Sequence, residues 1–343
     1  PGTARLRGDP AGVEEEGPVF AIRVEQVGGP EVIEGVEVPD PEPSAGELLV
    51  RVGAAGVNFI DTYQRSGLYP VPLPHHLGLE GAGTVVEVGE GVTGFAPGDR
   101  VAWADAPGSY AELAVVPAER AVPVPDGVGV DEAAAVMLQG MTAHYLTHDT
   151  FPLAPGHRCL VHAGAGGVGL LLVQLARMRG AEVFATAGTE EKRELARSTG
   201  AHHVVPYLDS SGSDFGDAVE AIAGPHALDV VYDGVGQQTF TRGLSLLRPR
   251  GTMVTFGNAS GPVEAVSPLA LSQGGSLYLT RPTLWHYVTD RPDLLRRAGD
   301  VLGWVRDGRL DVRIGGRLPL AEAASAHRLL EGRRTTGKVL LAP

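Results

Sequence analysis

The sequence contains a single cysteine, Cys159, among its 343 residues. One thiol rules out an intramolecular disulfide and cannot form a cysteine cluster around a metal ion. Long apolar runs are absent as well, because no segment approaches the roughly 20 apolar residues that a membrane-spanning helix needs. The longest apolar stretch with a helical pattern, residues 168–178, is interrupted by Gln174 and Arg177. We expect no membrane partner and, by default, a cytoplasmic location.

Basic residues are in the minority. The chain has 28 Lys and Arg against 41 Asp and Glu, which gives a formal net charge of −13. Such an acidic balance argues against binding to nucleic acid or to an anionic membrane surface. It remains compatible with a local basic pocket for one phosphorylated cofactor.

The length and the pattern of the chain predict two domains and an N-terminal extension. Residues 1–18 lack both a periodic apolar pattern and the apolar core of a signal peptide, and we expect a flexible extension there. From residue 19 onward, short apolar segments bounded by Gly, Pro or Asp predict a β-rich domain, with strands at 19–24, 48–54, 83–88 and 100–103.

After a helix predicted over residues 131–147, strands alternate with helices, which predicts a parallel, doubly wound α/β sheet. The expected strands are 158–163, 182–187, 203–207, 229–233, 251–256 and 276–280, and the expected helices are 168–179, 190–198, 215–222 and 239–247. The last elements, at 293–306, 310–314, 321–331 and 338–341, fit poorly as further repeats. We expect this tail to complete the first domain, leaving a cleft between a β-rich domain (19–143 and 281–343) and a Rossmann domain (144–280).

The most informative segment is an apolar strand that leads into a glycine loop and then a helix. Gly164, Gly166 and Gly169 satisfy the pattern G-x-G-x-x-G, in which the glycines permit a tight turn, close approach of a pyrophosphate, and packing of helix on strand. The phosphates would lie at a helix N-terminus, where free N–H groups favour anions. A tight turn without a ligand is the alternative. The candidate dinucleotide-binding residues are Gly164, Ala165, Gly166, Gly167, Val168 and Gly169.

The end of the next strand indicates which dinucleotide is bound. An NAD site usually carries Asp or Glu about 20 residues beyond the glycines, to bind the ribose 2′-hydroxyl. Residues 185–189 (ATAGT) are instead small and neutral, and Lys192 follows one helical turn later. This leaves room and charge for a 2′-phosphate, so NADPH is favoured, although Lys192 could simply be a solvated helix residue. Tyr207, at the following strand end, could line the adenosine side or play a structural part.

Several longer segments resemble one enzyme family. Residues 58–63 (NFIDTY), 65–70 (RSGLYP), 78–83 (GLEGAG), 256–261 (FGNASG) and 279–282 (LTRP) are similar to those of the zinc-independent quinone oxidoreductases, the bacterial relatives of zeta-crystallin. These enzymes belong to the medium-chain dehydrogenase/reductase superfamily, and the resemblance runs in order from about residue 19 to residue 343. It implies a GroES-like catalytic domain split around an NADPH-binding Rossmann domain, usually in a homodimer.

The resemblance also implies a site without metal. Zinc alcohol dehydrogenases of this superfamily carry a catalytic cysteine where this chain has Asn58, and a histidine where it has Leu79. Catalytic zinc needs three good ligands, and neither an amide nor an isobutyl side chain replaces them. The cysteine-rich loop for structural zinc is missing too, and the adjacent pair His75 and His76 lacks partners of ligand type nearby in the sequence. We therefore expect no metal.

The resemblance assigns further residues to the cofactor and the substrate. Asn58 and Tyr63 would line the nicotinamide end, and Tyr63 is the candidate to hydrogen-bond or protonate the reduced substrate. The alternatives are a turn-forming role for Asn58 and simple packing for Tyr63. The other implied cofactor contacts are Thr142 near the nicotinamide, Phe256 and Gly257 near its ribose, Gly188, Lys192 and Tyr207 near the 2′-phosphate, and Arg333 or Lys338 from the tail. Apart from Thr142, the alternative for these positions is ordinary surface charge. Gln139 and Ala259 depart from the family pattern, where lysine and serine are expected.

Three functions stay open from the sequence. Without a zinc ion to polarise a simple carbonyl, an acceptor that spreads charge over a conjugated system is the better match, and quinones and enones both qualify. The leading hypothesis is therefore an NADPH-dependent quinone reductase. The second is an enoyl or alkenal C=C reductase on the same scaffold. The third is a non-catalytic NADPH-binding protein with a structural or sensing role.

Overall fold

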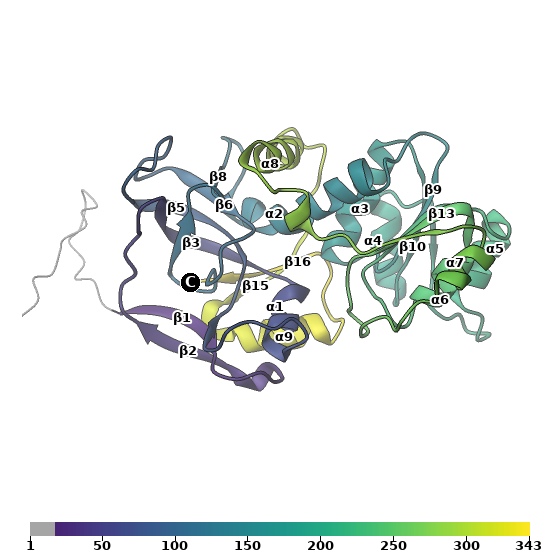
Figure 1. Ribbon diagram of the computed structural model, residues 1–343, viewed down its shortest axis with the longest axis horizontal. Coiled ribbons are helices and arrows are strands. Elements are labelled where there is room, and N and C mark those ends of the chain that lie inside the picture. The colour runs from purple at the N-terminus through teal and green to yellow at the C-terminus, as the bar shows by residue number, and fades with distance from the viewer. Residues whose placement is uncertain (1–17) are drawn as a thin grey trace, which may run out of the picture. The chain divides into compact units, whose positions relative to one another are not determined.

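The computed structural model describes residues 18–343, so the predicted N-terminal extension lies, except for Pro18, outside the described residues. The described chain forms two compact units (Figure 1). Unit 1 holds residues 18–124, 317–328 and 340–343, and unit 2 holds residues 125–316 and 329–339. These bounds differ from the expected domain bounds because helices α2 (Val130–Tyr145) and α8 (Arg291–Arg306) pack against each other within unit 2.

Unit 1 is built around two sheets, in which the pairings among β1 to β8 are antiparallel. A small sheet has the order β2-β1-β4, from β1 (Val19–Val24), β2 (Ile33–Val38) and β4 (His75–His76). A larger sheet has the order β15-β16-β3-β5-β6-β8, and β7 also pairs with β3. Its strands are β3 (Glu47–Val57), β5 (Glu80–Val88), β6 (Arg100–Trp103), β7 (Leu113–Pro117), β8 (Val122–Pro123), β15 (Ile314–Pro319) and β16 (Lys338–Ala342), the last two entering from unit 2.

Two helices belong to this β-rich unit, α1 (Phe59–Ser66) and most of α9 (Ala323–Glu331). The helix α1 begins directly after β3, at Asn58, whose backbone N–H donates to the carboxylate of Asp61 at 2.8 Å. It ends at Gly67, which takes the left-handed conformation with φ of 80° that glycine adopts without strain. The pattern of alternating strands did not predict α1, and yet α1 and its N-cap carry both candidate catalytic residues.

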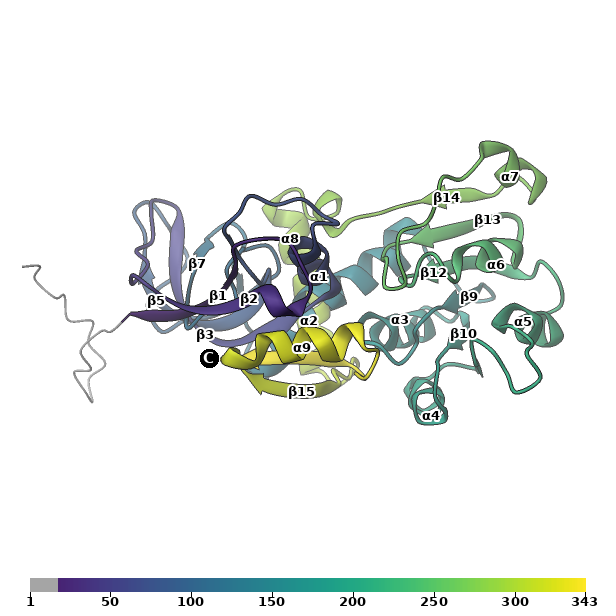
Figure 2. The same cartoon turned by 90° about the horizontal axis from the view of Figure 1, so that it is seen from below.

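Unit 2 contains a six-stranded sheet in which all pairs are parallel, with the order β11-β10-β9-β12-β13-β14. Figure 2 shows these strands following one another from β14 to β10. The strands are β9 (Arg158–Val161), β10 (Glu182–Thr186), β11 (His203–Val205), β12 (Leu228–Asp233), β13 (Leu247–Thr255) and β14 (Tyr278–Thr280). The helices between them are α3 (Gly167–Met178), α4 (Glu190–Thr199), α5 (Phe215–Ala223), α6 (Phe240–Ser245) and α7 (Pro268–Gln273). The predicted doubly wound α/β sheet is therefore confirmed.

Apolar side chains from the strands form the core of unit 2. Leu160, Phe184 and Val231 are fully buried in one cluster with residues of α5 and α6. Of the three strands that carry these residues, the sequence pattern predicted burial only for the first, at residues 159–163, and uniformly apolar strands are expected in a parallel sheet covered on both faces.

The predicted strand at residues 310–314 is wrong, because the observed strand β15 starts only at Ile314. The side-chain amide of Gln174 forms two hydrogen bonds with the backbone of Asp311. Its oxygen accepts from the Asp311 N–H at 2.8 Å, and its nitrogen donates to the Asp311 carbonyl at 3.0 Å. The backbone groups that a strand would use are thus bound to a helix side chain.

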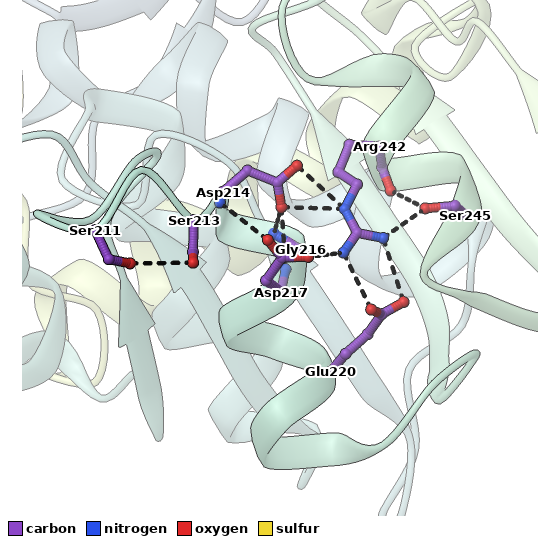
Figure 3. Close-up of polar contacts among 8 residues, drawn as sticks. All are labelled: Ser211, Ser213, Asp214, Gly216, Asp217, Glu220, Arg242 and Ser245. Atoms are coloured by element: carbon purple, nitrogen blue, oxygen red, sulfur yellow. Dashed lines mark hydrogen bonds and ion pairs between the residues drawn. The ribbon is translucent and has the colours of Figure 1, made fainter.

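Helices α5 and α6 are joined by one arginine (Figure 3). The guanidinium of Arg242 on α6 donates to Asp214 at 3.1 Å, to Asp217 at 2.8 Å and to Glu220 at 3.1 Å. A Cβ atom on Gly216 would lie 2.1 Å from Arg242 Nε, so the glycine makes room for this contact.

No helix among residues 18–343 combines the length and the apolar character needed to span a membrane.

Candidate functional site

The glycine loop connects β9 to α3 at the carboxyl edge of the parallel sheet. A Cβ on Gly169 would lie 2.2 Å from the carbonyl oxygen of Ala163, and one on Gly164 would lie 2.8 Å from the Cβ of Ala185. Both contacts are closer than real side chains allow. The glycines are therefore required by the close packing of loop, strand and helix, which is the role that the motif assigns to them.

The loop has the features of an anion site. Helix α3 begins after Gly166, and its first turn carries no acidic residue. The strand order reverses on either side of β9, since β10 and β12 flank it, and the crevice beside such a switch point is where doubly wound sheets bind ligands. The free N–H groups and the dipole at the N-terminus of a helix favour an anion such as phosphate.

Side chains at the strand ends hold the loop in shape. The N–H of Ala163, a residue with φ of 53°, donates to the hydroxyl of Tyr207 at 2.9 Å and approaches Thr186 Oγ1 at 3.2 Å. His162 Nδ1 lies 3.0 Å from the same threonine oxygen. Burial lowers the pKa of His162, so its ring is neutral near pH 7. Tyr207 thus contacts the backbone of the glycine loop, which is a structural role of the kind that the sequence analysis left open as the alternative to an adenosine contact.

Lys192, Gly188 and Arg333 lie at one end of this loop region. Lys192 is in the first turn of α4, and its Nζ donates to the carbonyl oxygen of Arg333 at 2.6 Å. Burial lowers the pKa of Lys192, and the charge of Arg333 lowers it further, against the opposing effect of Glu191. The position that a Cβ on Gly188 would occupy has no atom within 4 Å. Two neighbouring cations beside open space fit a phosphate monoester.

Arg333 and Lys338 come from the tail that follows α9. Arg333 takes a φ of 56°, and its guanidinium donates to Gln238 Oε1 at 3.2 Å. The N–H of Gly337 donates to the carbonyl of Ala165 in the glycine loop at 3.1 Å. Lys338 is 2% exposed and lines a small pocket with Gln139 and Gly167. The tail therefore contacts the loop directly, with Lys338 buried beside it.

The segment after β13 brings Phe256 and Gly257 to the same carboxyl edge of the sheet. The N–H of Phe256 donates to the carbonyl of Asp233 at 2.8 Å, and a Cβ on Gly257 would lie 2.4 Å from the carbonyl oxygen of Gly234. Arg281, which the sequence reasoning did not single out as a site residue, donates to the carbonyl of Gly257 at 2.9 Å. Thr142 comes from a different element, helix α2, where its side chain is 7% exposed.

Asn58 lies in unit 1, where it is 3% exposed. Its Nδ2 donates to Glu80 Oε2 at 2.8 Å and to the carbonyl of Gly56 at 3.1 Å. Glu80 and Asp61 are both fully buried. Two buried carboxylates thus contact one residue, Asp61 at the backbone and Glu80 at the side chain. Sequence reasoning missed both partners, although Asp61 lies within the quoted segment 58–63 and Glu80 within the quoted segment 78–83.

Tyr63 follows Asn58 on α1 and is 8% exposed. Its ring lies 6.0 Å from that of Phe59 and meets the ring of Tyr69 edge to face at 5.1 Å. Aromatic packing therefore restricts the position of the phenol.

A chain of buried polar groups extends from Asp61. Its carboxylate accepts from the hydroxyl of Tyr110 at 2.8 Å, and Tyr110 lies 3.5 Å from His327 Nε2. His327 Nδ1 is in turn 3.1 Å from the guanidinium of Arg65. Burial and the nearby Arg65 lower the pKa of His327 to about 3, which keeps this ring neutral. The helix that carries Asn58 and Tyr63 is thus anchored to α9 by polar contacts inside unit 1.

The donor set does not suit catalytic zinc. Among residues 18–343, no group of three or more His, Cys, Asp or Glu side chains comes together in a way that could hold a metal ion. Asn58 binds Glu80 through its amide nitrogen, and Leu79 offers no donor atom. The residues at these two positions therefore do not fit a catalytic zinc ion.

Two family models match the chain. Residues 44–126 match the alcohol dehydrogenase GroES-like domain, and residues 167–288 match the zinc-binding dehydrogenase family. The first match agrees with the predicted GroES-like fold of the β-rich part. The second description names the family as a whole. Whether this chain binds zinc depends on its own residues, and Asn58 and Leu79 are not zinc ligands.

Individual relatives are similar over almost the whole length. A quinone oxidoreductase of Pseudomonas aeruginosa is 46% identical over 94% of this chain and 99% of that protein. A 2-haloacrylate reductase of a Burkholderia species is 41% identical over 95% of this chain and 99% of that protein. The crystal structure of the Escherichia coli quinone oxidoreductase complexed with NADPH superimposes with a TM-score of 0.91 at 40% identity, covering 94% of this chain and 100% of that one. The chain belongs to the quinone oxidoreductase family of the medium-chain dehydrogenase/reductase superfamily.

Proposed function

We propose that this protein is an NADPH-dependent quinone reductase that works without zinc. The observation that carries the proposal is the contact of Lys192 Nζ with the backbone carbonyl of Arg333 at 2.6 Å, which brings two cationic residues into the same region, together with the open position at Gly188. A 2′-phosphate is the group that distinguishes NADPH from NADH, and this arrangement offers it two positive charges and space. The quinone oxidoreductase relatives and the NADPH complex of the Escherichia coli enzyme support the same conclusion.

The residues of unit 2 would bind the cofactor along its length. The pyrophosphate would contact the backbone at Gly164, Ala165, Gly166, Gly167, Val168 and Gly169, where α3 begins. The 2′-phosphate would contact Lys192, Arg333 and Gly188. Tyr207 would support the loop through its bond to Ala163, Lys338 would stabilise it from the buried side, and Phe256, Gly257 and Thr142 would lie toward the nicotinamide and its ribose. When bound, NADPH supplies the reducing equivalents.

The chain's own contribution at the reacting end is orientation and proton supply. We assign Asn58 and Tyr63 to that end. Tyr63 offers a phenol held between two other aromatic rings, which can donate a hydrogen bond to an acceptor oxygen as it gains electron density. Asn58 is fixed by Glu80 and the Gly56 carbonyl. A quinone needs no Lewis acid, because its conjugated ring delocalises the incoming charge.

The experiment that tests this proposal is an acceptor panel. Purified protein, treated with a chelator, is mixed with NADPH or NADH, and oxidation of the nicotinamide is followed with quinones and enones. Oxidation of NADPH by quinones, faster than that of NADH, is the expected result. If NADPH binds but no acceptor gives turnover, the non-catalytic function replaces both enzyme proposals.

A second candidate function is C=C reduction. The 41% identity to a 2-haloacrylate reductase favours it. Such a reaction adds a proton to carbon, for which the Tyr63 hydroxyl is the candidate donor. Faster oxidation of NADPH with enones or 2-haloacrylates than with any quinone would establish this function instead.

We also propose a homodimer formed along β14. This strand is the last in its sheet, and Tyr278 on it and Leu269 on the preceding α7 are each 62% exposed. An exposed edge strand with large apolar side chains is a template for pairing with another chain. Light scattering of wild type and Tyr278→Lys tests this: a dimer that becomes a monomer supports the proposal, and a wild-type monomer contradicts it.

A further inference from the structure

His162, just before the glycine loop, is 2% exposed and has one ring nitrogen bound and the other unpaired. Its Nδ1 lies 3.0 Å from Thr186 Oγ1, whereas its Nε2 has no hydrogen-bond partner among residues 18–343. The space beside Nε2 is apolar: a Cβ atom on Gly243 would lie 3.6 Å from Nε2 and 3.0 Å from the Met253 Cε methyl group. A water molecule at this point would lack the polar partners that hold buried water.

The unpaired nitrogen indicates where the proton of the ring lies. Burial lowers the pKa of His162, against the opposing effect of Asp233, so the ring is neutral and only one of its nitrogens carries a hydrogen. If Nε2 carried it, a buried N–H would face apolar groups. A buried N–H without an acceptor is rarer in proteins than a buried acceptor without a donor. The hydrogen therefore lies on Nδ1, and His162 donates it to Thr186 Oγ1.

Thr186 transmits this direction to Tyr207. Burial raises the pKa of Tyr207, and hydrogen bonds with the Thr186 side chain and the Ala163 N–H lower it in part. The Ala163 N–H lies 2.9 Å from the Tyr207 hydroxyl oxygen and 3.2 Å from Thr186 Oγ1. Since His162 Nδ1 and the Ala163 nitrogen both donate, the hydrogen of Thr186 points to the Tyr207 oxygen. That oxygen then accepts two hydrogen bonds, and its own hydrogen points out of the network.

We infer that His162 is a positioning residue that, through Thr186, commits the Tyr207 hydroxyl to donate a hydrogen bond to a phosphate oxygen of the bound cofactor. This inference rests on the proposed function, since it concerns the cofactor site of unit 2. With the hydrogen of His162 on Nε2, the bonds of the network would reverse, and Tyr207 would meet the phosphate with lone pairs only.

The surroundings of Tyr207 suit a phosphate. Tyr207 is half-buried and Ala163 is exposed, so the hydroxyl lies at the accessible end of the network. The charge of Arg333 acts on the phenol, which places the hydroxyl near the contact between Lys192 and Arg333. A hydroxyl that donates to an ionised phosphate oxygen forms a charge-assisted hydrogen bond, which is stronger than one between neutral groups.

NMR spectroscopy tests the direction of the network without any cofactor. Long-range 1H–15N spectra of protein labelled with 15N-histidine distinguish the two neutral tautomers, and the signals that disappear in His162→Gln belong to His162. We expect the hydrogen on Nδ1. A hydrogen on Nε2 overturns the inference.

A double-mutant cycle between residues 162 and 207 tests the role toward the cofactor, with the Kd of NADPH as the readout. We expect Tyr207→Phe to raise Kd by about 10- to 100-fold, as for a lost hydrogen bond to a charged group. His162→Leu should raise Kd by about 2- to 10-fold in the wild type and by less than about twofold in the Tyr207→Phe background, where no hydroxyl is left to orient. An equal rise in both backgrounds means that His162 does not act through Tyr207, and it overturns the inference.

Two further substitutions serve as matched controls. Thr186→Ser keeps the connecting hydroxyl and should bind NADPH like the wild type, whereas Thr186→Val removes it and should match His162→Leu. His203→Leu replaces a histidine on the neighbouring strand β11 that is bound to Glu182, and it should leave the Kd of NADPH unchanged. If Thr186→Val binds NADPH as tightly as Thr186→Ser, the connection through Thr186 is wrong.

The same cycle with NADH identifies the phosphate. An effect confined to NADPH assigns the acceptor to the 2′-phosphate, and an equal effect with both cofactors assigns it to the pyrophosphate. A wild-type protein that binds neither cofactor defeats the proposed function and, with it, the role of Tyr207 toward a phosphate. The tautomer of His162 would then still report, separately, whether the network has the inferred direction.

Discussion

Lys192 Nζ donates a hydrogen bond to the backbone carbonyl of Arg333 at 2.6 Å, although 141 residues separate the two along the chain. The contact brings the tail after α9 to the first turn of α4. Two positively charged residues therefore lie in the same region of unit 2. Their spacing in the sequence gives no indication that they are neighbours.

We predict that Lys192→Met raises KM for NADPH by about 10- to 100-fold and leaves KM for NADH nearly unchanged. The lost contact is a charge-assisted hydrogen bond to a phosphate, which is worth about 1.5–3 kcal/mol, and NADH lacks that phosphate. Steady-state kinetics with both cofactors measures the ratio. The control is Arg197→Gln, which removes a cation from the same helix at a position bound to Glu190 and Glu194. An equal loss with both cofactors would contradict a 2′-phosphate site at Lys192.

We predict that Tyr63→Phe lowers kcat by about 10- to 100-fold while KM for NADPH changes little. The phenylalanine keeps the ring contacts with Phe59 and Tyr69 but lacks the hydroxyl that would interact with the acceptor oxygen during reduction. Initial rates at saturating NADPH check this. Tyr69→Phe is the matched control, because it removes a hydroxyl from the neighbouring ring. A Tyr63→Phe enzyme with wild-type kcat would show that Tyr63 is only a packing residue.

We predict that Arg242→Gln lowers the free energy of unfolding by about 1–2 kcal/mol at pH 7, because it leaves Asp214, Asp217 and Glu220 close together on partly exposed positions (Figure 3). Burial alone raises the pKa of Asp214, but the Asp217 N–H and the Arg242 guanidinium outweigh it and lower the pKa. A lowered carboxyl pKa stabilises the fold above the unfolded pKa of about 4, and this stabilisation is lost as the pH falls through the native value.

Urea unfolding at pH 7 and at pH 3 measures this effect. The destabilisation by Arg242→Gln should shrink at pH 3, where the carboxylates take up protons. Arg306→Gln serves as the control, since the ion pair of Arg306 is with the adjacent, exposed Asp307. A penalty of equal size at both pH values would mean that Arg242 acts by packing alone.

We predict that His327 makes the protein sensitive to acid. The native pKa of His327 is about 3, because burial and then Arg65 oppose its protonation, whereas an unfolded histidine titrates near 6.5. Between these values the unfolded chain binds a proton that the native state does not, so the free energy of unfolding falls as the pH decreases from about 6.5 toward 3. The slope is about 1.4 kcal/mol per pH unit at most.

Replacing His327 tests the prediction. The quantity to compare is the slope of the unfolding free energy against pH, and not the unfolding free energy at one pH. His327→Gln should flatten the dependence of unfolding free energy on pH between about 6 and 4, by up to one proton. His286→Gln, at an exposed position, should leave the slope as it is. If His327→Gln shows the slope of the wild type, another buried group dominates, such as His144, whose pKa burial lowers to about 4.

The sequence by itself determined the class of the fold and the place of the glycine loop. Alternating apolar segments and helices required a parallel sheet, because a strand buried on both faces must be uniformly apolar and its crossover must be a helix. The spacing of Gly164, Gly166 and Gly169 is a local property of one turn. The neutral end of β10 and Lys192 are local as well, so the amino-acid sequence alone favours NADPH over NADH.

Only the tertiary structure decided which distant residues meet. Arg333 reaches Lys192, and Tyr207 reaches Ala163, through contacts between segments far apart in the sequence. Glu80 meets Asn58 because β3 and β5 pair in register, with Gly56 opposite Glu80. The strand predicted at residues 310–314 does not form for a similar reason, because the side chain of Gln174 on α3 forms hydrogen bonds with the backbone of Asp311. Periodicity records the local fit of each element, whereas the buried polar contacts depend on how elements are arranged in space, and no local pattern contains that information.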